Sequence, residues 1–254
     1  MSESAIVFLH VPKTAGQTIH NELVRLVGGE KYVSPVRVHT QARPEEQLRP
    51  GYRLYSGHID WSAIDQLAAR RFVFTVLRDP QERIASFYFY LLKEARELSR
   101  EQLDLPENTG KQKILEESPD DYFFGGDAAW QDFIRDHYDN FYCNYFASRL
   151  MRGRGTLVDV SRSDLIERAS TALEGLNGVY TTDRLDRLED DIHMRFGVRI
   201  SVTDSFVNAG DRPAGEERWP RLARTFDDEK NAERLAEYAS ADEELMTRIG
   251  ASTR

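Results

Sequence analysis

The residues with the clearest chemical potential lie between positions 8 and 18, where the sequence reads Phe-Leu-His-Val-Pro-Lys-Thr-Ala-Gly-Gln-Thr. An apolar run, residues 5–9, precedes them, and apolar residues at the spacing of one helix face follow between positions 19 and 27. The order strand, tight loop, helix presents backbone N–H groups and the positive end of a helix dipole to an anion. We call residues 10–18 the lysine loop and expect it to bind a phosphate-like group through Lys13, Thr14, Ala15, Gly16, Gln17 and Thr18.

The lysine loop is not a Walker A motif. That motif has the order Gly-x-x-x-x-Gly-Lys-Ser/Thr, whereas here Lys13 follows a proline. A kinase with an aberrant loop remains an alternative, and it would need an acidic residue at a strand end to hold magnesium. Asp79 follows a strand, but its place directly before Pro80 is better explained as a turn residue.

A second set of residues begins about sixty positions later. Residues 71–77 form an apolar run that predicts a buried strand, and Pro80 suits the first turn of a helix. Arg78 at the strand end and Ser86 two turns into the helix can reach one phosphate. Together with Lys13 and Arg83, Arg78 would make a local basic pocket. We call residues 78–88 the arginine motif.

His58 follows a third short strand, which ends in Ser56-Gly57-His58. A side chain just past a strand end, beside a glycine, can project into a cleft at that edge of a sheet. An imidazole titrates near neutral pH and is the usual group for removing a hydroxyl proton. A helix is expected to follow from Trp61, through Ile64 and Leu67.

The lysine loop and the arginine motif, in this order, resemble the sulfotransferases that use 3′-phosphoadenosine 5′-phosphosulfate (PAPS). The branch most similar contains the heparan sulfate and uronyl 2-O-sulfotransferases. The resemblance implies that the lysine loop holds the 5′-phosphosulfate, that Arg78 and Ser86 hold the 3′-phosphate, and that His58 is the catalytic base. That branch has His-Gly-His where this chain has Ser56-Gly57-His58, so the first histidine is absent or its role has moved.

The resemblance also implies a reaction and further contacts. Lys13 would stabilise the leaving phosphate during in-line transfer to a hydroxyl of a saccharide acceptor. Adenosine 3′,5′-bisphosphate would be the product, and no metal would be needed. A loop at residues 206–213 would close over the donor through Asn208 and Arg212. Arg149, Arg37 and His39 are candidates for acceptor binding; a surface salt bridge for Arg149 and a solvated loop for the other two are the alternatives.

Length and net charge limit the fold class and the class of binding partner. The 254 residues fit a single α/β domain, three-layered and P-loop-like, with a central parallel sheet flanked by helices. Within it, residues 94–128 are acidic and turn-rich and are expected to form a variable insertion or a lid. The net charge of −9 argues against a nucleic-acid partner.

A single cysteine, Cys143, suits a reducing compartment and is expected to be buried filler. No apolar segment near the N-terminus is long enough for a membrane anchor, which predicts a soluble, cytoplasmic, bacterial-type member of the family. A catalytically silent module that binds nucleotide or glycan is a further alternative, and the presence of both Lys13 and His58 argues against it.

Overall fold

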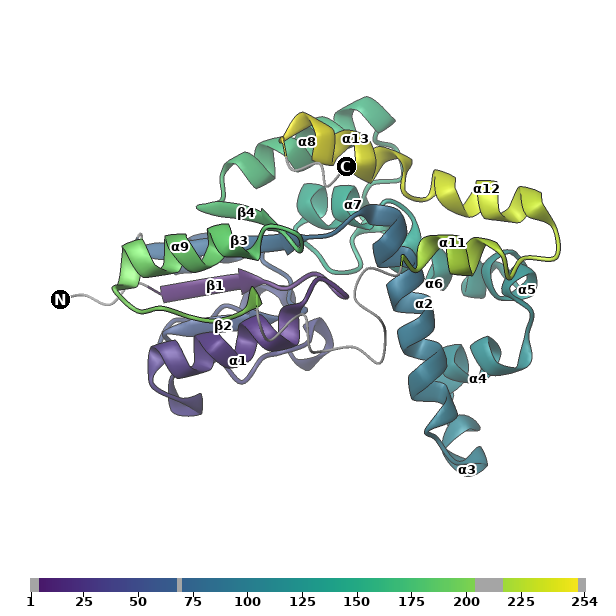
Figure 1. The fold of residues 1–254 in the computed structure, drawn as a ribbon, viewed down its shortest axis with the longest axis horizontal. Coiled ribbons are helices and arrows are strands. Elements are labelled where there is room, and N and C mark those ends of the chain that lie inside the picture. The colour runs from purple at the N-terminus through teal and green to yellow at the C-terminus, as the bar shows by residue number, and fades with distance from the viewer. Residues whose placement is uncertain (1–4, 68–69, 204–216, 251–254) are drawn as a thin grey trace.

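A four-stranded parallel sheet forms the centre of the computed structural model, which describes residues 5–67, 70–203 and 217–250 (Figure 1). Its strand order is β2-β1-β3-β4, and the strands are β1 (Ala5–Leu9), β2 (Leu54–Gly57), β3 (Arg71–Leu77) and β4 (Gly178–Thr181). Leu9 pairs with Gly57 of β2 and with Thr75 of β3. Because all pairs are parallel, the segments that follow β1, β2 and β3 leave the sheet at one edge.

Helices cover both faces of the sheet, as the sequence predicts. Alternate strand residues enter two different cores, with Ile6 and Phe8 on one face and Val7 and Leu9 on the other. The first face is covered by α1 (Gly16–Val27) and α9 (Leu185–Phe196). The second is covered by α7 (Phe141–Ser148), α8 (Arg162–Glu174) and α13 (Ser240–Arg248). The three-layer α/β prediction is therefore confirmed.

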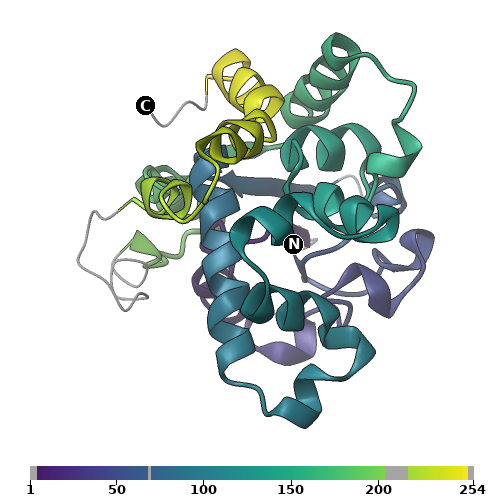
Figure 2. The ribbon, with the colours of Figure 1, turned by 90° about the vertical axis from the view of Figure 1, so that its right-hand side faces the viewer.

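A group of helices extends from the edge where β3 ends. Its longest member, α2 (Pro80–Arg96), stands in front of the sheet when seen from that side (Figure 2). It is joined by α3 (Arg100–Leu103), α4 (Thr109–Glu116), α5 (Pro119–Phe124), α6 (Ala128–Tyr138), α11 (Trp219–Ala223) and α12 (Glu229–Glu237). A third apolar cluster joins these helices. Residues 94–128 thus contain helices that pack on α2, and their role as a lid stays a prediction.

Two expected helices differ from the structure. The segment from Trp61 forms only a 3₁₀ turn, Ile64–Gln66, and the Trp61 N–H donates to the carbonyl of Arg149 at 2.9 Å. Its apolar residues are buried in the core, so their spacing reflects packing. The aromatic-rich helix expected over residues 129–150 is divided at Asn140, whose φ of 44° ends α6 and starts α7. Cys143 is buried, as predicted.

The start of α7 depends on a carboxylate from the far end of the chain. Asp242 accepts hydrogen bonds from the backbone N–H groups of Tyr142 (2.9 Å) and Cys143 (2.8 Å) and is 1 % exposed. We expect Asp242→Ala to lower the free energy of unfolding by about 1–3 kcal/mol, because two buried donors lose their acceptor. Urea denaturation measures this, with Asp159→Ala, at an exposed position, as the control. Equal stabilities for the two variants would contradict the capping role.

Candidate active site

The lysine loop has a backbone shape that favours an anion. Lys13 and Ala15 have φ values of 73° and 67°, in the left-handed region that residues with a side chain rarely adopt. Ala15 is the N-cap of α1, where no side chain caps the helix and no acidic residue occupies the first turn. Strained residues persist where the surroundings enforce them, typically at ligand sites. The loop therefore directs the helix dipole and uncapped N–H groups toward one point.

A pocket of about 360 Å³ opens at this point, and we call it the lysine-loop pocket. It unites the two sequence motifs and the strand-end histidine: its walls are His10, Pro12, Lys13, Ala15, Gly16, Gln17, Thr18, His58, Arg78, Ser86, Phe87, Tyr90 and Arg218. Of the six loop residues expected to bind a phosphate-like group, only Thr14 does not line the pocket. Thr14 is fully buried and donates its hydroxyl to the Val11 carbonyl at 2.9 Å, so it holds the loop in shape.

The pocket is positively charged although the whole chain carries a net charge of −9. Lys13 lies near Arg78 and Arg218, and burial together with these two cations lowers its pKa to about 8. Its ammonium lies 3.8 Å from the centre of the Tyr90 ring. A bound anion would relieve the repulsion among the three cations, which makes the pocket suited to phosphate or sulfate.

Glu82 holds the arginine motif against α11. It forms an ion pair with Arg78 at 2.8 Å and accepts from the backbone N–H of Trp219 at 2.7 Å. Asp79 is also occupied, because its carboxylate caps α2 by accepting from the Glu82 N–H at 3.0 Å. Arg78 thus follows the end of β3, and Ser86 lies in the second turn of α2.

Arg83 was expected in this basic pocket, and the structure corrects that expectation. Its side chain is 1 % exposed and points away into the helical group, donating to the carbonyl of His137 at 2.9 Å. The guanidinium also lies 4.7 Å from the centre of the Phe141 ring. Arg83 therefore joins α2 to α6 and α7 and does not line the lysine-loop pocket.

Both the main-chain N–H and the main-chain carbonyl of His58 are hydrogen-bonded. Its N–H donates to the Arg37 carbonyl at 2.8 Å, and its own carbonyl accepts from the His39 N–H at 2.7 Å. Its ring Nδ1 lies 2.8 Å from the His10 carbonyl, which can only accept, so Nδ1 carries the hydrogen. Burial lowers the pKa of His58 most; the hydrogen bond to the His10 carbonyl opposes this shift, and the nearby His39, Arg37 and Lys13 add to it. At neutral pH the ring is uncharged, and Nε2 is its basic nitrogen.

Arg37 and His39 lie beside His58, outside the lysine-loop pocket. A guanidinium nitrogen of Arg37 lies 2.6 Å from Nε2 of His20, whose Nδ1 lies 3.1 Å from the Ser56 hydroxyl. His20 thus stands next to Ser56. Gly57 permits this arrangement, because a Cβ there would lie 2.2 Å from the Arg37 carbonyl oxygen.

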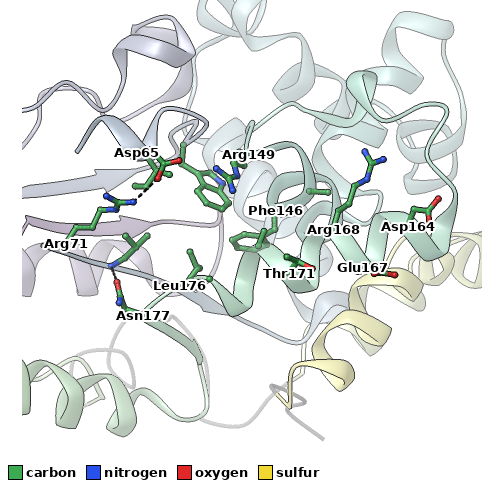
Figure 3. Close-up of a pocket in the computed structure, with 16 residues that line it drawn as sticks. Asp65, Arg71, Phe146, Arg149, Asp164, Glu167, Arg168, Thr171, Leu176 and Asn177 are labelled. Carbon is green, nitrogen blue, oxygen red and sulfur yellow. Dashed lines mark hydrogen bonds and ion pairs between the residues drawn. The ribbon is translucent and has the colours of Figure 1, made fainter. Parts of the chain in front are cut away.

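Arg149 lies elsewhere, in the wall of a second cavity of about 880 Å³ between the loop after β2 and α8 (Figure 3). Its guanidinium lies 4.8 Å from the centre of the Trp61 ring. The cavity has walls of mixed charge, including Arg168, Asp164 and the Arg71–Asp65 ion pair, and shares no residue with the lysine-loop pocket. Asn208 and Arg212 fall outside the described residues.

Five wall residues were not anticipated as site residues: the polar His10, Tyr90 and Arg218, and the apolar Pro12 and Phe87. His10 belongs to the quoted lysine-loop sequence, so its position was a usable signal. Tyr90 follows Ser86 by one helical turn and could have been placed from that spacing. Arg218 comes from a distant part of the chain, and no local pattern marks it.

Comparison with known proteins supports the resemblance at the level of the family. A model described as the sulfotransferase family matches residues 2–188, while no curated protein matches the chain. Among the described residues, no three or more His, Cys, Asp or Glu side chains are grouped to hold a metal ion. The described helices include none with the length and apolar character needed to cross a membrane. The family model covers most of the chain, and the chain belongs to the sulfotransferase family.

Proposed function

We propose that this protein moves the sulfuryl group of PAPS to the hydroxyl of a saccharide acceptor. The observation that carries the proposal is the meeting of the lysine loop, Arg78, Ser86 and His58 in one pocket. The saccharide acceptor rests on the resemblance to the 2-O branch. PAPS supplies an activated sulfuryl group and carries a 3′-phosphate that ATP lacks.

The residues present fit such a donor. The uncapped start of α1 and Lys13 suit the 5′-phosphosulfate, and Arg78 with Ser86 suits the 3′-phosphate. Arg218, unforeseen from the sequence, adds a cation to the same pocket. Asn208 and Arg212 remain proposed contacts.

The reaction divides between two residues. His58 Nε2 takes the proton of the acceptor hydroxyl as the oxygen–sulfur bond forms. Lys13 and the N–H groups of the lysine loop stabilise the negative charge that develops on the phosphate oxygen as its bond to sulfur breaks. The two groups must lie on opposite sides of the sulfur for in-line transfer, and both line the same pocket.

The kinase alternative has less support. It needs a carboxylate beside the phosphates, whereas the described walls of the lysine-loop pocket contain no Asp or Glu, and Asp79 caps α2. The silent-module alternative predicts the same donor binding without transfer. A measurement of transfer by the wild type separates it from our proposal.

Donor binding tests the pocket first. We expect adenosine 3′,5′-bisphosphate to bind more tightly than ATP with magnesium in calorimetric titrations. Arg78→Ala should weaken bisphosphate binding by roughly tenfold to a hundredfold, as the loss of a charged hydrogen bond does. Arg187→Ala, at an exposed position on α9, is the control. A preference for ATP would refute the sulfotransferase proposal.

His58→Ala should abolish transfer while leaving the bisphosphate affinity within about threefold, because the base acts on the acceptor and not on the donor. Release of bisphosphate from PAPS, with a panel of unsulfated glycosaminoglycan oligosaccharides as acceptors, measures transfer. His193→Ala, on α9, is the matched control. If His58→Ala loses donor binding instead, His58 belongs to the donor site.

Lys13→Ala should lower kcat by a factor equivalent to about 2–4 kcal/mol, with Lys31→Ala as the exposed control.

In the wild type, the pH profile of kcat/KM should fall on the acid side below pH 6.5, where His58 becomes charged. It should fall on the alkaline side near pH 8, where Lys13 loses its charge. An alkaline limb near 10.5, the ordinary pKa of lysine, would contradict this role for the buried Lys13.

A further inference from the structure

His10 lies between the two halves of the proposed active site. Its ring centre is 4.2 Å from that of His58, with an angle of 33° between the ring planes. It also stacks on Phe8, with the ring centres 5.2 Å apart and an angle of 17° between the ring planes. Its carbonyl accepts the Nδ1 hydrogen of His58 at 2.8 Å, so both its main chain and its side chain contact the base.

The same ring contacts the start of α1. A Cβ built on Gly16 would lie 1.6 Å from Nε2 of His10, which means that the imidazole occupies the space a side chain would need. Gly16 is the first residue of α1, and its N–H belongs to the group that faces the anion. One imidazole therefore separates the ring of His58 from the backbone of the lysine loop.

We propose that His10 is a positioning residue that sets the spacing between the base His58 and the start of α1 at Gly16. The inference rests on the proposed sulfuryl transfer. In-line transfer requires the acceptor oxygen, sulfur and leaving oxygen to be aligned, and a misplacement of about 1 Å can cost a hundredfold in rate. His10 fixes this spacing because it is packed between the two groups and bonded to one of them.

His10 also keeps water away from one face of His58. Burial lowers the pKa of His10 well below its usual value, with His58, Arg37, His20 and Lys13 contributing, so the ring is neutral. The charged and titratable groups that act on His58 are His39, Arg37 and Lys13, besides His10 itself. Removing the His10 ring admits water to the buried base, which reduces the desolvation that disfavours its charged form.

Two substitutions separate the possible roles. His10→Ala removes the spacer, whereas His10→Phe keeps a flat ring without any nitrogen. We expect His10→Ala to bind adenosine 3′,5′-bisphosphate within about threefold of the wild type and to lose about a hundredfold in transfer rate. The pKa of His58, followed by NMR titration of its ring protons, should rise toward 6.5, the ordinary value. His10→Phe should keep most of the rate and the lowered pKa of His58.

The other outcomes contradict the proposal. If His10→Ala leaves the pKa of His58 and the transfer rate unchanged, the His10 ring only fills space and does not position His58. If His10→Phe is as inactive as His10→Ala, a ring nitrogen is required, and His10 contacts the reacting group. Should His10→Ala not fold, His10→Leu fills the space without a flat ring and is compared with His10→Phe in its place. His193→Ala controls for general effects of losing a histidine.

The test also distinguishes a failure of the underlying function. If His58→Ala retains transfer, His58 is not the base and the proposed mechanism fails. If His58→Ala is inactive but His10→Ala matches the wild type, the mechanism stands and only the positioning role is lost.

Discussion

The parallel pairing of β1 with both β2 and β3 is the constraint on which the site depends. Leu9 lies level with Gly57 and Thr75, so the segments after these strands begin at one edge of the sheet. The lysine loop, His58 and the arginine motif therefore meet although they are dispersed over the first third of the chain. An antiparallel partner would place one of them at the opposite edge. Ligands of open parallel sheets bind at this carboxyl edge for the same reason.

The electrostatic character of the site comes from positively charged side chains that are gathered in a partly buried pocket. Lys13, Arg78 and Arg218 converge without a described carboxylate in the pocket wall, and Glu82 reaches Arg78 from behind. The histidines near them stay neutral, because burial and the neighbouring cations both disfavour protonation. The pocket thus combines fixed positive charge for an anion with an uncharged nitrogen that can accept a proton. Burial is the main cause of the neutral histidines, and Lys13 and Arg37 add to it.

Much of this arrangement could be predicted from the sequence because its determinants are local. A strand, a loop with Lys13 and Gly16, and a helix are encoded within twenty-three residues. Arg78 at the end of β3 and Ser86 on α2 are likewise close in the sequence. Side-chain direction was less accessible. Arg83 lies one turn from residues of the pocket, yet the aromatic rings of α7 draw it into the helical group.

Contacts between distant segments were not predictable. Arg218 reaches the pocket because Glu82 holds the start of α11, a pairing that no spacing along the chain reveals. The segment after Trp61 has a helical pattern of apolar residues, but it forms a single 3₁₀ turn whose apolar side chains are buried in the core. In both cases tertiary structure overrides the local signal.

The contact between His10 and Gly16 has a consequence for how this sequence can vary. The imidazole fills the space beside Gly16, so the choice of residue at position 16 is coupled to the choice at position 10. Any side chain at position 16 requires a much smaller residue at position 10, and a glycine at position 16 leaves room for a ring. Related chains that differ at one of these positions are therefore expected to differ at the other. Substitutions introduced there by design must be made as a pair.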